Sequence, residues 1–171
     1  MKKKLIFGML LVSLLFIFTG CTDLMNTPTK RVEELFSKYQ TLDKDITKEI
    51  DTLVKSENLT DEEANRYRNI IEKQYKMLVY NVKDEKIDGD NATVTVQIEV
   101  LDYKSAIQKV DLNYQDDNYD KVKYTKDKLD ALEQTKDKVT YTIEVPLVKK
   151  NKKWQVSNLS NDDLKKIQGM Y

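Results

Sequence analysis

The chain has 171 residues, enough for one domain and a short additional segment. It contains no histidine and one cysteine, Cys21, so a disulfide within the chain, a Cys/His metal site and histidine-based catalysis are excluded. Basic and acidic residues balance at 29 each, so we expect no strong electrostatic attraction for nucleic acid.

Residues 1–20 have the pattern of an export signal. Three lysines at positions 2–4 precede a mostly apolar run over residues 5–18, which is too short to cross about 30 Å of hydrocarbon comfortably. Removing residues 1–20 removes those lysines and no acid, which leaves 26 basic and 29 acidic residues and a net charge of −3. We expect a signal peptide over 1–20, an anchor and linker over 21–28, and a single domain over 29–171.

The apolar run ends in Phe18, Thr19, Gly20 and Cys21, which resembles the lipobox of bacterial lipoproteins. Thr19 and Gly20 fit that pattern, and Phe18 replaces the usual leucine. The resemblance implies that the signal is cleaved just before Cys21 and that Cys21 carries a diacylglyceryl group with fatty acids such as palmitate. It therefore implies a lipid-anchored protein on the outer face of the cytoplasmic membrane. The alternatives are an ordinary signal peptide with a chance cysteine, or an uncleaved membrane anchor.

The domain begins with two apolar stripes of helical spacing. The first predicts one long helix and comprises Val32, Leu35, Phe36, Tyr39, Leu42, Ile46, Ile50 and Leu53. The second follows a capping box at Thr60 and Glu63 and comprises Ala64, Tyr67, Ile70, Ile71, Gln74 and Leu78. We expect both helices to cover the apolar face of a sheet rather than to form a coiled coil with a partner.

Residues 74–103 predict the end of the second helix and a β-hairpin. Gly89 supplies the positive φ that the turn needs. After the turn, apolar residues occupy the even positions from Ala92 to Val100 and polar residues the odd ones, so one face should be buried. Val96 and Ile98 should be buried and Gln97 exposed.

A second hairpin is predicted over residues 139–156, with its turn at residues 149–153. Pro146 cannot donate a hydrogen bond to a neighbouring strand, so it predicts an edge position or a bulge. The consecutive apolar residues Leu147 and Val148 favour the bulge. After this hairpin, Ser160 should cap a last short helix that Gly169 ends.

Residues 104–138 separate the two hairpins and predict two short helices. The expected fold class is therefore α+β, with two N-terminal helices packed on a four-stranded antiparallel sheet and a helical insertion between the two hairpins. This order of elements resembles the nuclear-transport-factor-2-like (cystatin-like) fold. The chain also resembles small lipoproteins of unknown function from low-GC Gram-positive bacteria. Cys21 alone receives a functional role from these resemblances.

Few residues predict chemistry. The acidic segment around Asp84 and Asp88 has Lys86 where a calcium loop needs a ligand, and Lys121 stands where a second such loop needs glycine. Asp102 and Tyr103 form the one adjacent pair that would suit acid–base catalysis. We expect no catalytic residue, no metal and no cofactor.

Two groups of residues suggest binding. Tyr80, Tyr141 and Trp154 are expected on the inner face of the sheet, as core residues or as the lining of a pocket. The four lysines of residues 149–153 either keep an exposed turn soluble or contact anionic lipid or cell-wall polymer.

The sequence thus favours a non-enzymatic, extracytoplasmic lipoprotein that binds a protein, a peptide or a cell-envelope component. The alternative is a small-molecule-binding lipoprotein with a pocket between sheet and helices. A third hypothesis is an enzyme that uses a buried Asp or Tyr.

Overall fold

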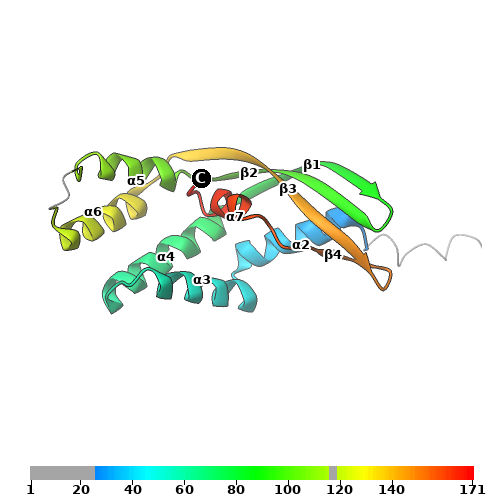
Figure 1. The fold of residues 1–171 in the computed structure, drawn as a ribbon, viewed down its shortest axis with the longest axis horizontal. Coiled ribbons are helices and arrows are strands. Elements are labelled where there is room, and N and C mark those ends of the chain that lie inside the picture. Colours follow the sequence, from blue (N-terminus) through cyan, green and yellow to red (C-terminus); the bar gives the residue numbers. More distant parts are fainter. Residues whose placement is uncertain (1–25, 116–118) are drawn as a thin grey trace, which may run out of the picture.

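The computed structural model describes residues 26–115 and 119–171 (Figure 1). The predicted signal peptide, the lipobox and Cys21 lie outside these residues. Within the described residues, six helices and a four-stranded antiparallel sheet form an α+β fold, which confirms the expected class. None of the described helices combines the length and the apolar composition needed to cross a membrane.

The first apolar stripe is divided between two helices, α2 (Pro28–Thr41) and α3 (Lys44–Ser56). Leu42 takes a left-handed conformation with φ of 52°, and the Asp43 side chain then accepts hydrogen bonds from two backbone N–H groups of α3. The prediction of one long helix is therefore wrong. The four-residue spacing from Leu42 to Ile46 continues across the break, so periodicity alone does not reveal it.

The third helix, α4 (Asp61–Met77), begins as the sequence predicts. The Thr60 hydroxyl accepts from the backbone N–H of Glu63, and the Glu63 carboxylate accepts from the backbone N–H of Thr60. Among the residues from Asn26 onward, three helices therefore precede the sheet, where the sequence predicts two.

The remaining elements are β1 (Val79–Asp88), β2 (Asn91–Leu101), α5 (Tyr103–Asp111), α6 (Lys121–Gln134), β3 (Lys138–Lys150), β4 (Lys153–Val156) and α7 (Asn161–Ile167). The sheet has the order β1-β2-β3-β4, with every neighbouring pair antiparallel. Two helices, α5 and α6, lie between β2 and β3 in sequence, and α7 follows β4. Gly89 in the β1–β2 turn and Gly169 just after α7 both have positive φ, as the sequence predicts.

The even-numbered face of β2 is buried, as predicted: every side chain from Ala92 to Val100 on that face is at most 5% exposed. Gln97 on the opposite face is half-buried, and the expectation that it is exposed is wrong. The reason is that β2 lies between β1 and β3, so side chains on both flanking strands cover part of its outer face.

The bulge is not where the sequence predicts it. β2 and β3 pair without a register shift through Pro146 and Leu147, whereas the shift lies in β1, between Val82 and Asp84. Pro146 is accommodated because β4 pairs only with Leu147–Lys150, so the preceding part of β3 forms an edge. The backbone N–H of Ser157 donates to the Pro146 carbonyl at 2.8 Å.

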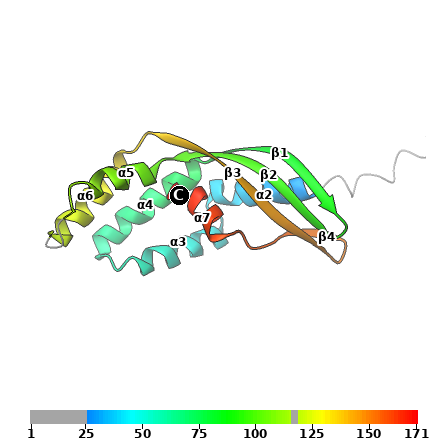
Figure 2. The ribbon, with the colours of Figure 1, turned by 45° about the horizontal axis from the view of Figure 1, so that its top comes forward.

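The domain is elongated, with different elements at its two ends (Figures 1 and 2). Both hairpin turns lie at one end, where α2 also begins. The hairpin of α5 and α6 lies at the opposite end. Between them, α2 contacts β1, β2 and β4, while α4 contacts α2, α3, α6 and β2.

A buried side-chain amide lies between the half of the domain that contains the sheet and the half that contains the α5–α6 hairpin. Gln74 of α4 is fully buried; its side chain donates to the carbonyl of Leu101 and accepts from the N–H of Leu101, at 3.0 and 2.9 Å. Gly169 lies against the same site, where a Cβ would come within 2.2 Å of the Gln74 amide nitrogen. The carbonyl of Gly169 accepts from the N–H of Lys104 at the start of α5. The end of β2 and the segment after α7 therefore meet at the Gln74 side chain, and the start of α5 is bonded to that segment.

Candidate binding surfaces

The end of the domain formed by residues 111–115 and 119–127, which we call the tip, carries a cluster of three tyrosines. The rings of Tyr114, Tyr119 and Tyr124 contact one another, with centroids 5.2–5.6 Å apart. The Tyr114 hydroxyl donates to Asp127, and the Tyr124 hydroxyl donates to Asp111 at 2.8 Å. These two hydrogen bonds join α6 to the last residue of α5 and to the segment just after it, and they fix the cluster.

The same aspartates change the titration of the two tyrosines. The hydrogen bond to Asp127 raises the pKa of Tyr114 to about 12. Burial, followed by the hydrogen bond to Asp111, raises the pKa of Tyr124 to about 12. Both phenols therefore stay protonated at neutral pH and act as hydrogen-bond donors, not as bases.

Beside the tyrosines, the tip exposes aliphatic side chains. Leu112 is 68% exposed and Val122 is 75% exposed, the two highest values among the exposed large apolar residues of the described segments. Tyr119 is 36% exposed. Exposed aliphatic and tyrosine side chains that lie together are typical of protein-binding surfaces.

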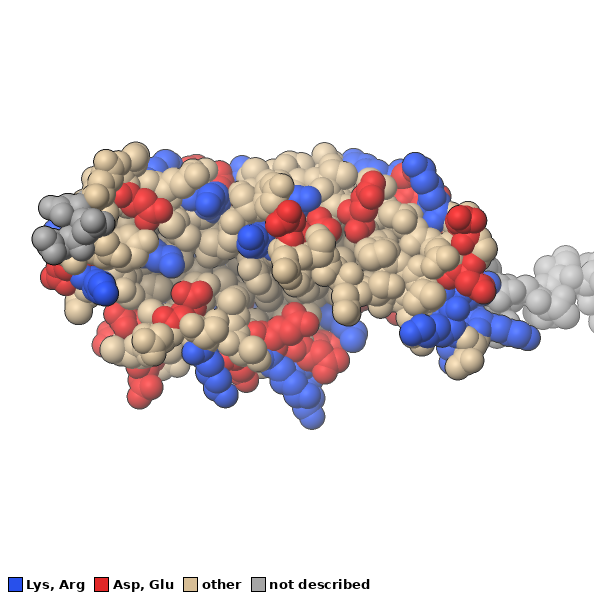
Figure 3. Space-filling model, viewed as in Figure 1, with Lys and Arg blue, Asp and Glu red and all other residues tan. Residues whose placement is uncertain are grey.

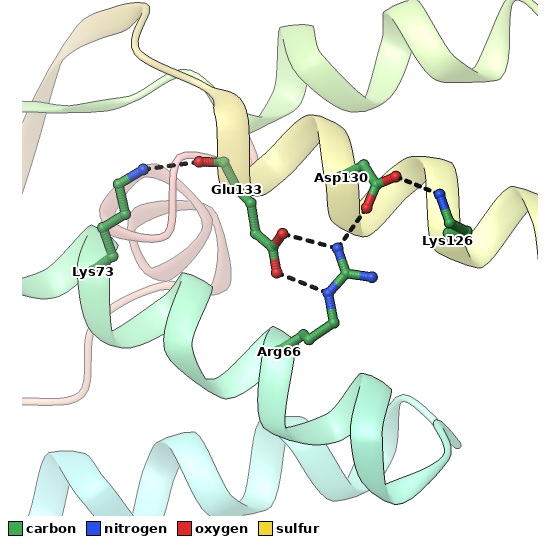
Figure 4. Close-up of polar contacts among 5 residues, drawn as sticks. All are labelled: Arg66, Lys73, Lys126, Asp130 and Glu133. Atoms are coloured by element: carbon green, nitrogen blue, oxygen red, sulfur yellow. Dashed lines mark hydrogen bonds and ion pairs between the residues drawn. The ribbon is translucent and has the colours of Figure 1, made fainter.

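Ion pairs attach α6, the second helix of the hairpin that carries the tip, to α4 in the body of the domain. Arg66 of α4 donates two hydrogen bonds to Glu133 of α6, each at 2.8 Å, and a third to Asp130 at 2.6 Å (Figure 4). Lys126 contacts the other oxygen of Asp130 at 2.8 Å, and Lys73 donates to the Glu133 carbonyl at 3.0 Å. The hydrogen bonds to Lys126 and Arg66 lower the pKa of Asp130, and Arg66 lowers that of Glu133.

The opposite end carries four exposed lysines in the β3–β4 turn, which we call the lysine turn: Lys149, Lys150, Lys152 and Lys153. Asn26 binds this turn through its side chain. Its amide nitrogen donates to the Lys152 carbonyl at 2.7 Å, and its amide oxygen accepts from the backbone N–H of Trp154 at 3.1 Å. The first described residue is therefore held against the lysine turn.

The three aromatic residues predicted to line a pocket do not line one common hollow. Tyr80 is half-buried and stacks on Phe36, with ring centroids 4.8 Å apart. The Tyr141 hydroxyl donates to the Tyr171 carbonyl at 3.0 Å. Tyr80 and Tyr141 flank Ile98 on neighbouring strands.

Trp154 is 5% exposed, and the Lys149 ammonium lies 5.4 Å from its ring centroid. It borders an open hollow of about 420 Å³ between α2 and β4, whose lining includes Arg31 and Glu34. Neither Tyr80 nor Tyr141 is among the residues that line this hollow.

Asp102 and Tyr103, the pair that suits acid–base chemistry, are both engaged in structural hydrogen bonds. The Asp102 carboxylate caps α5 and accepts from the N–H and the hydroxyl of Ser105, at 3.0 and 2.7 Å. Tyr103 is fully buried, and its hydroxyl donates to the Ile70 carbonyl at 3.0 Å. Burial raises the pKa of Tyr103 well above its usual value.

Side chains in the two acidic segments that partly resemble calcium loops form structural hydrogen bonds. Glu85 of β1 accepts hydrogen bonds from the backbone and the hydroxyl of Thr29 in α2, at 2.8 and 2.6 Å. Asp120 caps α6 by accepting from Val122 and Lys123. In residues 26–115 and 119–171, no three acidic or cysteine side chains gather as a metal site would require.

The tip cluster and the role of Asn26 are not among the sequence-based predictions. The one available signal for the tip is that Tyr114 precedes Asp127 by thirteen residues and Asp111 precedes Tyr124 by thirteen. Asp127 and Tyr124 lie on α6, Asp111 ends α5 and Tyr114 follows it, so the pairing becomes apparent only when α5 and α6 are placed together.

Comparisons with known proteins add little. No family model matches the chain, and no curated protein matches it. Among solved structures, the chain is similar to a candidate lipoprotein (ycdA) from Bacillus subtilis, with a TM-score of 0.41 and 17% identity. The match covers 80% of this chain and 46% of that protein, so the chain spans less than half the length of its structural relative.

Proposed function

We propose that this protein is a non-enzymatic lipoprotein, anchored through Cys21 on the outer face of the cytoplasmic membrane, that binds a protein partner with its tip. The lipobox at Phe18, Thr19, Gly20 and Cys21 supports the anchor. Two acyl chains hold a protein at a bilayer where one does not, so a diacylglyceryl group needs no spanning helix.

The observation that carries the proposal is the arrangement of the two ends. Asn26, which follows Cys21 by five residues, lies at the hairpin-turn end, and the exposed apolar surface of the tip lies at the other (Figure 1). An anchor at the first end directs the tip away from the bilayer. Leu112, Val122 and the tyrosines are then presented to other proteins of the cell envelope, not to lipid.

Packing of the interior favours surface binding over the alternative of a small-molecule pocket. Apart from the open hollow beside β4, the space between α2 and the sheet is filled by side chains such as Phe36, which is fully buried and stacks on Tyr80. Val32 of α2 and Val94, Ile98 and Ile143 of the sheet are at most 1% exposed. A partner would therefore contact the outside of the domain. The side chains of Asp102 and Tyr103 are engaged in structural hydrogen bonds, which supports the proposal that they do not act as an acid–base pair.

The test is site-specific photocrosslinking in living cells. A benzophenone amino acid at Val122 should form an adduct with one protein partner, because this side chain projects from the tip. Val79 of β1 is the matched control: it is also valine, it is 53% exposed, and it lies outside the tip. The Val122 adduct should disappear when Leu112→Ser is added to the same protein. Equal adducts at both positions, or an adduct that survives Leu112→Ser, would contradict tip binding.

A further inference from the structure

The lysine turn is bonded to Asn26, the described residue that lies closest to Cys21 along the chain. A fully extended chain spans at most about 3.6 Å per residue, so Asn26 lies within about 18 Å of Cys21. The two hydrogen bonds of Asn26 to Lys152 and Trp154 then keep the backbone of the turn close to a residue that is held within this limit. This limit follows from chain length and holds for any path of the intervening residues.

The charges at this end differ between its two hairpin turns. The lysine turn carries four positive side chains, all exposed, and none of them forms an ion pair within the described residues. The neighbouring β1–β2 turn carries Asp88 and Asp90, and the Lys149 N–H donates to the Asp90 carbonyl at 2.7 Å. In the space-filling view, blue side chains gather below the red ones at this end (Figure 3). An anionic surface would therefore attract one turn and repel the other.

We propose that the lysine turn docks on anionic phospholipid headgroups beside the anchor and so sets the domain upright on the bilayer. The proposal rests on the lipid anchor of the proposed function and adds an orientation to it. Basic residues near an anionic bilayer are attracted within about one Debye length, roughly 8 Å at physiological salt. The short tether keeps the four lysines close enough to enter this zone, whereas the tip lies at the other end of the domain (Figure 1).

The attraction has a predictable size. Each lysine near an anionic surface should raise the ratio of docked to undocked domain about fivefold, the equivalent of about 1 kcal/mol. Replacing three lysines should lower that ratio about a hundredfold. Because the interaction is electrostatic, salt should have the same effect on the unmodified protein.

The single tryptophan of the chain provides the readout. Trp154 lies directly after the lysine turn, and its backbone binds Asn26. The lipidated protein is reconstituted into vesicles of phosphatidylcholine alone, or of equal parts phosphatidylglycerol and phosphatidylcholine, each containing a lipid with a nitroxide on its headgroup. Nitroxides quench tryptophan only at short range, so quenching reports that the turn is docked.

The test variant carries Lys150→Gln, Lys152→Gln and Lys153→Gln, and it keeps Lys149 because that side chain lies over the Trp154 ring. The matched control removes the same charge from exposed lysines outside the hairpin-turn end, with Lys104→Gln, Lys121→Gln and Lys123→Gln. Circular dichroism verifies that both variants are folded.

We expect strong quenching of the unmodified protein and of the control in anionic vesicles, and weak quenching in neutral vesicles, in high salt and in the test variant. Equal quenching in both kinds of vesicle, or equal loss in the test variant and the control, would overturn the proposal. Protection of the lysine turn from amine acylation by soluble wall teichoic acid but not by anionic vesicles would also overturn it, in favour of a polymer. Failure of the anchor itself is recognised separately, because Cys21 would then carry no fatty acid.

Discussion

The two ends of the domain differ both in what they expose and in how they are held. The lysine turn belongs to the sheet, so it is supported by continuous pairing of β3 with β2 and by the contact of α2 with β4. The tip is joined to the body by helix packing and by the ion pairs of Arg66, which are partly exposed to solvent. We infer that the hairpin-turn end is the more rigid one and that the tip can change its conformation at lower cost.

The largest expected effect comes from a change in the body that supports both ends. Ile98 is fully buried between Tyr80 and Tyr141, so Ile98→Ala should lower the free energy of unfolding by about 2–5 kcal/mol. Gln97→Ala, the adjacent control, should change it by no more than about 0.5 kcal/mol. Urea denaturation followed by circular dichroism measures both. Similar small losses for the two variants would contradict the assigned faces of β2.

The next effect concerns the junction between the two halves. Gln74→Leu leaves the buried N–H and carbonyl of Leu101 without their partner, and it should cost about 2–4 kcal/mol, since an unsatisfied buried polar group costs about 1–3 kcal/mol. Hydrogen exchange should show lost protection at Leu101 and Lys104, while the β3–β4 hairpin keeps its protection. Protection lost evenly along the chain would show that the junction does not separate the two halves.

A smaller effect is expected where the tip joins the body. Arg66→Ala removes the hydrogen bonds to Asp130 and Glu133 and should cost about 0.5–1 kcal/mol, because these side chains are partly exposed and water screens their attraction. Arg68→Ala is the control, since Arg68 pairs with Asp51 of α3 and does not contact the tip. Salt titration of the melting temperature should narrow the difference between unmodified protein and Arg66→Ala. Faster amide exchange in α6 should appear with Arg66→Ala alone.

The smallest effect concerns the tyrosine hydroxyls of the tip and depends on pH. The pKa values of Tyr114 and Tyr124 are raised from 10.0 to about 12 in the folded protein, so their contribution to stability is complete below pH 10 and is lost as the pH rises towards 12. The double variant Tyr114→Phe, Tyr124→Phe should melt slightly below the unmodified protein at neutral pH. The two melting temperatures should converge between pH 10 and 12. A difference that stays constant over this range would contradict the assigned hydrogen bonds.

Local patterns predict much of this fold. The alternation in β2, the capping box at Thr60 and the glycine at position 169 each depend on neighbouring residues, and all three are confirmed. The break at Leu42 is missed because a left-handed leucine has no strong sequence signal, although Asp43 is a good helix cap.

The candidate surfaces could not be predicted in the same way, because they depend on contacts between distant residues. Arg66 and Glu133 are 67 positions apart, and Asn26 and Lys152 are 126 positions apart. No helical or strand period relates such pairs. The lysine turn is visible in the sequence, but its proximity to the start of the domain requires the folded chain.

The account depends most directly on lipid attachment at Cys21. The decisive measurement is metabolic labelling with an alkyne fatty acid, followed by membrane fractionation of the unmodified protein and of Cys21→Ala. We expect label on the unmodified protein in the membrane fraction and none on Cys21→Ala, which should be secreted or held by an uncleaved signal. Absence of label on the unmodified protein, or label that survives Cys21→Ala, would contradict the anchor and with it the orientation of both ends.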